Sequence, residues 1–103
     1  MDTFLTHCAS CHGIFGEGDG PVAATIAVPA PNLRTLSERN GGVFPEEAVS
    51  SYIDGRDMPV VHGDRIMPVW GPIFDATSRI VVGADDSNAR IAAVVGYLRE
   101  LQY

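Results

Sequence analysis

The chain has 103 residues, of which 46% are hydrophobic and 19% are charged, so its composition is that of a folded globular protein and not of a disordered one. The length predicts one small domain over residues 1–103. The formal net charge is −6 and all seven basic residues are arginines, which excludes a basic nucleic-acid surface and a polybasic membrane-binding segment. No apolar run approaches the roughly 20 residues of a membrane span, and no signal peptide is recognisable.

The first half of the chain predicts short helices separated by a long loop. Residues 2–11 are expected to begin a helix, and residues 13–32 are so rich in Gly, Pro and Ala that they predict an ordered loop. Within that loop, residues 22–27 favour a helical turn. A short helix is expected over 33–39, because the Asn-Gly-Gly sequence that follows stops it.

The middle of the chain predicts one amphipathic helix and then another loop. Pro45 suits a first helical position, and the two glutamates behind it are favourable near the positive end of the helix dipole. Gly55 is expected to end this helix. Residues 56–80 are expected to be mostly loop, because prolines and glycines surround two Met-Pro pairs.

The last helix has the clearest pattern. Asp85, Asp86 or Ser87 can cap it, and apolar residues recur at helical spacing between Ile91 and Leu101. No stretch alternates convincingly as a strand. The sequence therefore predicts a small all-α domain of about four to five helices with long loops, and loops of this length usually enclose something functional.

Chemistry is concentrated in the sequence Cys8-Ala9-Ser10-Cys11-His12, which holds both cysteines of the chain. A dithiol oxidoreductase uses Cys-x-x-Cys at a strand-to-helix turn beside a parallel sheet, which this sequence does not predict. A structural zinc site needs four ligands, and the fourth would have to be the lone His62. Cys-x-x-Cys-His is the pattern that attaches a c-type haem through two thioether bonds and ligates its iron with the histidine.

A second axial ligand is predicted downstream. Met67 precedes a proline, which disfavours a helical conformation for the methionine and suits a ligand presented from a loop. Met58 and His62 are alternative ligands in the same region. His7, just before the first cysteine, is expected to be an exposed helix residue.

Several stretches spread over nearly the whole chain resemble one family. They are CASCHG, GDGP, PNLRTLSERNGGVFP, YIDGR, MPVWG and VVGYLREL, and they occur in the family's order. On these residues the chain resembles a class I monohaem c-type cytochrome of the short bacterial periplasmic type. The Trp-Gly that follows Met67 completes the family pattern and favours this methionine over Met58 and His62.

The resemblance implies a small cytochrome c fold wrapped around one covalent haem c, and it assigns roles to individual residues. Cys8 and Cys11 would form the thioether bonds, His12 would be the proximal iron ligand and Met67 the distal one. Further haem-contacting roles are implied for four residues. The Pro21 carbonyl would accept a hydrogen bond from the His12 ring, the Trp70 indole would reach a haem propionate, and Arg56 or Arg65 would pair with a propionate. Phe4 and Tyr97 would pack where the first and last helices cross.

The implied function is one-electron transfer in the periplasm, with no enzymatic reaction on the protein itself. Redox partner proteins would make transient contacts at an exposed haem edge, near Ile14, Phe15 and residues 58–61. Neither nucleic acid nor membrane insertion is expected. The alternative is an electron-transfer module or subunit of a larger periplasmic or membrane-bound oxidoreductase, because only seven residues precede Cys8. A haem-based ligand sensor or peroxidase is a weaker alternative, because it needs an open iron position.

Overall fold

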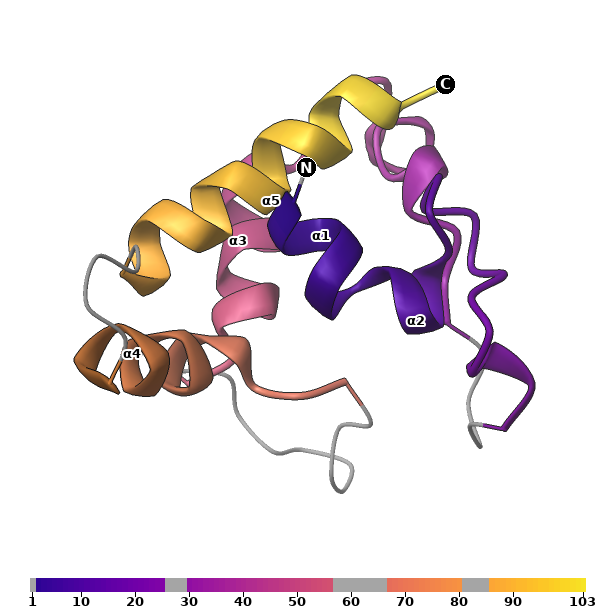
Figure 1. Cartoon of the computed structure of the whole chain (residues 1–103). Coiled ribbons are helices and arrows are strands. Elements are labelled where there is room, and N and C mark those ends of the chain that lie inside the picture. The colour runs from indigo at the N-terminus through magenta and orange to yellow at the C-terminus, as the bar shows by residue number, and fades with distance from the viewer. Residues whose placement is uncertain (1, 26–29, 57–66, 81–85) are drawn as a thin grey trace.

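The computed structural model describes residues 2–25, 30–56, 67–80 and 86–103 (Figure 1). These residues form five α-helices and three short 3-10 helices, and they contain no strand. The α-helices are α1 (Asp2–His7), α2 (Ala9–His12), α3 (Glu46–Asp54), α4 (Trp70–Ile80) and α5 (Ser87–Leu101). The 3-10 helices are η1 (Ala23–Thr25), η2 (Leu33–Thr35) and η3 (Glu38–Asn40). In the described part of the chain, no helix is long and apolar enough to cross a membrane.

Helix α5 is the centre of the packing, because α1, α3 and α4 all contact it (Figure 1). Its inner face contributes four buried side chains at helical spacing, namely Ile91, Val94, Val95 and Leu98. Phe4 from α1, Ile53 from α3 and Phe74 from α4 complete this core. The apolar pattern of the C-terminal sequence therefore marks the helix on which the others assemble.

The first and last helices, α1 and α5, pack against each other. Phe4 is fully buried, and its ring centroid lies 5.0 Å from that of Tyr97. Tyr97 also donates a hydrogen bond of 3.0 Å from its hydroxyl to the Ile14 carbonyl. This confirms the predicted packing of Phe4 on Tyr97, and it places the loop after the cysteine motif beside α5.

The predicted helix ends agree with the structure at two positions. Asp86 is the residue that caps α5, since its carboxylate accepts a 2.9 Å hydrogen bond from the Ala89 amide. Gly55 ends α3 in the left-handed conformation, with φ of 76°. The sequence predicted the stop at Gly55 directly, whereas the structure selects Asp86 from the three capping residues that the sequence offered, Asp85, Asp86 and Ser87.

The expectation that residues 56–80 are mostly loop is wrong for their second half, which forms α4. Gly71 and Pro72 favour a loop reading, but both lie in the first turn of the helix. A proline is tolerated there because its missing N–H would have no partner within the helix. The buried side of this helix includes Phe74, which is 1% exposed.

Two other predicted helices are divided in the structure. The first one is interrupted at Cys8, which separates α1 from α2. The helix expected over 33–39 is instead the pair η2 and η3, and Asn32 caps the first of them by accepting a hydrogen bond from the Arg34 amide. Short, loop-rich segments of this kind depend on tertiary contacts and not on helix propensity.

Because α5 lies at the centre of the packing, we expect a buried valine on this helix to contribute more to the free energy of unfolding than an exposed valine elsewhere. Val94→Ala should lower the free energy of unfolding of the holoprotein by about 2 kcal/mol, because it removes apolar burial and leaves a cavity. Val43→Ala is the matched control, since Val43 is 66% exposed, and it should change stability by less than about 0.5 kcal/mol. Guanidinium unfolding measures both, and equal effects would contradict this description of the core.

Candidate functional site

The cysteine motif forms a single helical turn at the junction of α1 and α2. The amides of Cys11 and His12 both donate to the Cys8 carbonyl, at 3.3 and 3.0 Å. Cys8 and His12 are buried, with 7% and 8% exposure, and Cys11 is half-buried. The turn thus carries both thiols and the imidazole on one short segment, whose N-terminal side is anchored by Phe4 in the core.

The His12 ring is oriented by a backbone carbonyl. Its Nδ1 lies 3.3 Å from the Pro31 carbonyl oxygen, so an Nδ1–H donated to that oxygen leaves the lone pair on Nε2. Burial lowers the pKa of His12, and the hydrogen bond to Pro31 opposes this shift only in part. A neutral imidazole with one nitrogen held and the other available is the form that ligates a metal.

The sequence-based assignment of this carbonyl to Pro21 is wrong. Pro21 is exposed in the turn that follows Gly20, whereas Pro31 lies against the loop that follows the motif. The Leu33 amide donates to the Gly16 carbonyl at 2.6 Å. This hydrogen bond holds residues 31–33 against the loop, close to His12. The correct proline depends on how the loop folds back, which local sequence does not encode.

The loop after the motif covers the free end of α2. Amides of Gly18, Gly20 and Val22 donate to the carbonyls of His12, Cys11 and Ser10, at 2.7, 3.1 and 2.9 Å respectively. These are carbonyls that a helix terminus leaves without intrahelical partners. Gly20 lies so close to the turn that an added Cβ would be 2.5 Å from the Ala9 carbonyl oxygen and closer still to that of Ser10.

The electrostatics of the thiols differ from those of a dithiol oxidoreductase. Burial, followed by the proximity of Cys11, raises the pKa of Cys8 to about 11. Redox-active cysteines instead need a lowered pKa, since the thiolate is the nucleophile. Within the described residues there is no strand beside the motif and no group of three or more His, Cys, Asp or Glu side chains that could hold a metal. The described residues therefore support neither the dithiol nor the zinc hypothesis, and His62, the fourth zinc ligand considered, lies outside them.

An aromatic cluster joins the motif to α4. The His7 ring lies 5.2 Å from Trp70 and 5.3 Å from Phe74, and the two latter rings stack at 5.5 Å. His7 is half-buried, not exposed as expected, and burial together with Arg90 lowers its pKa. Sequence reasoning missed Phe74 and the contact of His7, because both depend on the unexpected helix α4. Trp70 lies beside the motif, three residues after Met67.

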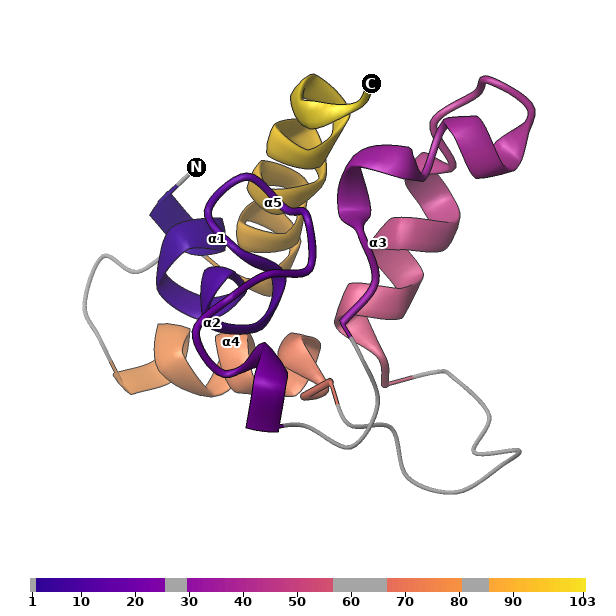
Figure 2. The same cartoon turned by 90° about the vertical axis from the view of Figure 1, so that its right-hand side faces the viewer.

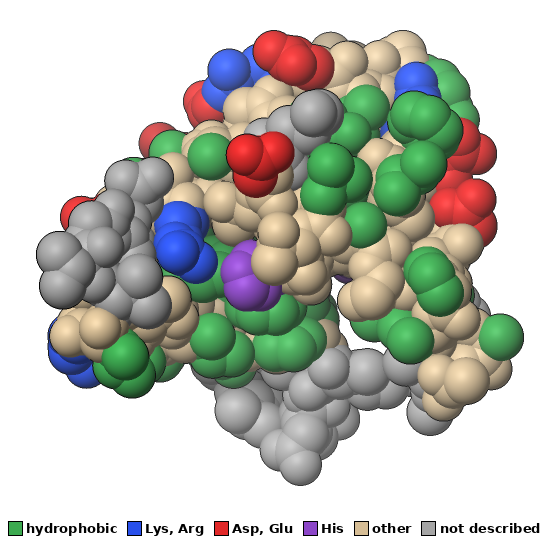
Figure 3. All heavy atoms as spheres, viewed as in Figure 1, with side chains coloured by type: hydrophobic (Ala, Val, Ile, Leu, Met, Phe, Trp, Pro, Cys, Tyr) green, Lys and Arg blue, Asp and Glu red, His purple; other side chains and the backbone are tan. Residues whose placement is uncertain are grey.

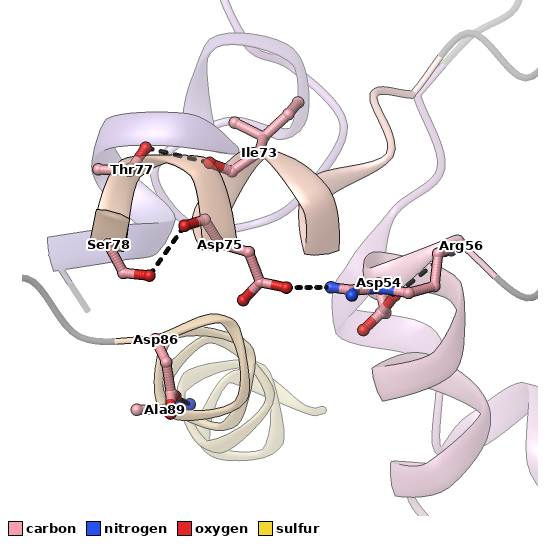
Figure 4. Close-up of polar contacts among 8 residues, drawn as sticks. All are labelled: Asp54, Arg56, Ile73, Asp75, Thr77, Ser78, Asp86 and Ala89. Atoms are coloured by element: carbon pink, nitrogen blue, oxygen red, sulfur yellow. Dashed lines mark hydrogen bonds and ion pairs between the residues drawn. The ribbon is translucent and has the colours of Figure 1, made fainter. Parts of the chain in front are cut away.

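Two of the remaining predicted residues, Met67 and Arg56, lie near α4. Met67 is half-buried and packs against the core. The stretch that carries it lies below α2 in both ribbon views (Figure 1, Figure 2). Arg56 is bound by two carboxylates, with Nε 2.7 Å from Asp54 and Nη2 2.9 Å from Asp75 (Figure 4). Met58, His62 and Arg65 lie outside the described residues.

The arrangement combines a buried Cys-x-x-Cys-His turn, an oriented imidazole and a methionine on a separate segment. The family model for cytochrome c matches residues 2–102 of the chain. The chain belongs to the cytochrome c family. No match was found among curated proteins or among solved structures. As a cytochrome c, the protein has the expected small all-α fold, carries covalent haem c with its iron and takes part in haem-based electron transfer.

The residues of the site fit this group. The motif supplies two thiols for thioether bonds and one imidazole whose second nitrogen is held by Pro31. In the space-filling view, hydrophobic side chains gather on the described surface below α1 (Figure 3). An apolar surface of this kind suits a porphyrin, since most of the porphyrin surface is apolar.

The close contact of Gly20 with α2 generates a prediction. Gly20→Ala should lower the free energy of unfolding of the cytochrome by at least about 2 kcal/mol, because the new methyl group would displace the covering loop from the motif. Gly96→Ala is the matched control, since nothing in the described part of the chain lies within 4 Å of a Cβ added there. It should be neutral or stabilise the protein by up to about 1 kcal/mol. Equal stability of both variants by guanidinium unfolding would contradict the close packing.

Proposed function

We propose that this cytochrome c is a periplasmic one-electron carrier with a single haem, bound through Cys8 and Cys11 and ligated by His12 and Met67. The observation that carries the proposal is the buried His12 ring, whose Nδ1 is fixed by Pro31 so that Nε2 is the coordinating atom. When bound, haem c supplies an iron that alternates between the ferric and ferrous states. The chain contributes the two iron ligands, His12 and Met67, and limits the access of water to the haem.

The choice of Met67 as second ligand rests on its position. It precedes α4, whose first residue, Trp70, packs on Phe74 and on His7, the neighbour of Cys8. The methionine and the thioether turn are therefore linked through one aromatic cluster. A methionine thioether favours the ferrous state more than a second imidazole does, which suits a carrier of relatively high potential. With two protein ligands, substrate binding and enzymatic turnover are not expected.

Of the two arginines considered as partners of a haem propionate, Arg56 and Arg65, we favour Arg65. The Arg56 guanidinium is engaged by Asp54 and Asp75, and this leaves Arg65 as the proposed propionate partner. We still propose that Trp70 contacts the haem, because it follows Met67 by three residues and belongs to the aromatic cluster with His7 and Phe74.

The contact surface for redox partners is proposed to lie next to the motif. Ile14 and Phe15 directly follow the haem-attachment sequence and are 58% and 56% exposed. Small apolar surfaces of this kind suit transient contacts, which must release the partner quickly. The negative net charge favours encounter with a basic partner. The periplasmic location is proposed because this type of haem attachment belongs to exported proteins.

The ligand assignment is tested by the charge-transfer band between a methionine thioether and ferric iron. Met67→Ala should abolish this band, whereas Met58→Ala should leave it unchanged, because only the first variant loses the proposed ligand. The visible spectrum of the oxidised protein measures both. The opposite pattern would move the ligand to Met58, and loss of the band in neither variant would exclude both methionines.

Covalent attachment and function are tested on the same preparation. After denaturation in acid, the wild-type haem should stay with the polypeptide, whereas the double variant Cys8→Ala/Cys11→Ala should release it into organic solvent. The reduced wild-type protein should not bind carbon monoxide rapidly at neutral pH, because Met67 occupies the sixth position. Rapid binding would contradict the carrier role and favour a ligand sensor.

A further inference from the structure

One cluster of charged side chains is not used by the proposed electron-transfer site. Arg56, just after α3, donates from Nε to Asp54 and from Nη2 to Asp75 on α4, at 2.7 and 2.9 Å (Figure 4). Hydrogen bonds from Ser87, and then from Arg56, lower the pKa of Asp75. Asp75 therefore connects the end of α3, the middle of α4 and the start of α5.

The backbone around this cluster is shaped to bring the charges together. Gly55 has a φ of 76°, which residues with a side chain rarely adopt. It turns the chain so that Arg56 folds back on Asp54. Gly71 in the first turn of α4 leaves the space that the pair fills. A Cβ added at Gly71 would lie 2.5 Å from Arg56 Nη2 and 2.5 Å from Asp54 Oδ1.

The position of the cluster in the chain relates it to Met67. Met67 lies three residues before α4, and that helix carries both Gly71 and Asp75. The ion pairs thus join the end of α3 to the helix that begins three residues after Met67. Fixing α4 relative to α3 reduces the positions that the thioether sulfur, so close to the start of α4, can reach.

We propose that Arg56 is a positioning residue for Met67: its bridge from Asp54 to Asp75 fixes α4 relative to α3 and so holds the methionine on the iron. The inference rests on the proposed ligation by Met67. It replaces the propionate contact considered for Arg56 with a role that acts through the protein. The bridge is made of partly exposed groups, with side-chain exposures of 38% for Arg56 and 26% for Asp75, so its effect is modest.

The test measures how easily an external ligand displaces the methionine. The ferric holoprotein is titrated with imidazole, and loss of the thioether charge-transfer band gives the affinity. Arg56→Gln and Asp75→Asn should each raise the affinity for imidazole about three- to fivefold. The double variant should exceed neither single variant, because both substitutions remove the same interaction. Arg56→Lys keeps the charge without the planar two-sided geometry and should fall between wild type and Arg56→Gln.

Two further variants separate this role from general effects of charge and stability. Arg99→Gln removes the same charge from an ion pair with Glu46 that joins α3 to α5 elsewhere, and it should change the affinity less than about twofold. Gly71→Ala leaves every charge in place but displaces the Arg56 and Asp54 side chains from α4, so it should act in the same direction as Arg56→Gln. Thermal unfolding of each variant shows whether the affinity follows global stability.

The outcomes distinguish the possible failures. A wild-type protein that lacks the band would overturn both the ligation by Met67 and this inference. A wild type with the band, together with equal affinities for Arg56→Gln and Arg99→Gln, would overturn the inference alone. An effect of Arg56→Gln without any effect of Asp75→Asn would also overturn it, since that pattern indicates a direct contact of Arg56 with the haem.

Discussion

The site depends on the hydrogen bonds that hold a four-residue helix in place. A single turn of helix is not stable in water by itself, because nucleation costs more backbone entropy than one turn recovers. In this protein the loop that follows α2 donates three amides to its terminal carbonyls, while Phe4 and Cys8 bury the other side in the core. The positions of two thiols and one imidazole are therefore set by tertiary contacts on both sides of the turn.

The core explains why so small a chain tolerates so much irregular structure. The helices α1, α3 and α4 all pack on α5, so each of these short helices is stabilised by contact with the same helix. The ion pair between Arg99 and Glu46 adds a polar contact between α5 and α3 at the surface. A domain of this size buries a modest fraction of its surface. The haem enlarges the apolar interior that the polypeptide alone provides.

Local chemistry could be predicted from the sequence, whereas most long-range contacts could not. The motif and the stop at Gly55 follow from residues within a few positions, and the cap of the last helix was predicted as Asp85, Asp86 or Ser87. The pairing of Phe4 with Tyr97 is a long-range contact that the family resemblance implied. The helix α4 was missed, because Gly71 and Pro72 are typical of loops and only their place in a first turn makes them compatible with a helix. The exchange of Pro21 for Pro31, and the burial of His7, depend on which segments meet in three dimensions.

The contact between Phe4 and Tyr97 also has a consequence for the order of events while the protein is made. The partners lie at opposite ends of a chain of 103 residues, so α1 reaches its final place only when α5 has been synthesised. Until then Cys8 is not buried, and the burial that raises its pKa to about 11 is absent. The Cys8 thiol is thus more accessible in the nascent chain than in the finished fold. Access to the Cys8 sulfur is therefore greatest before the last helix has packed over the first.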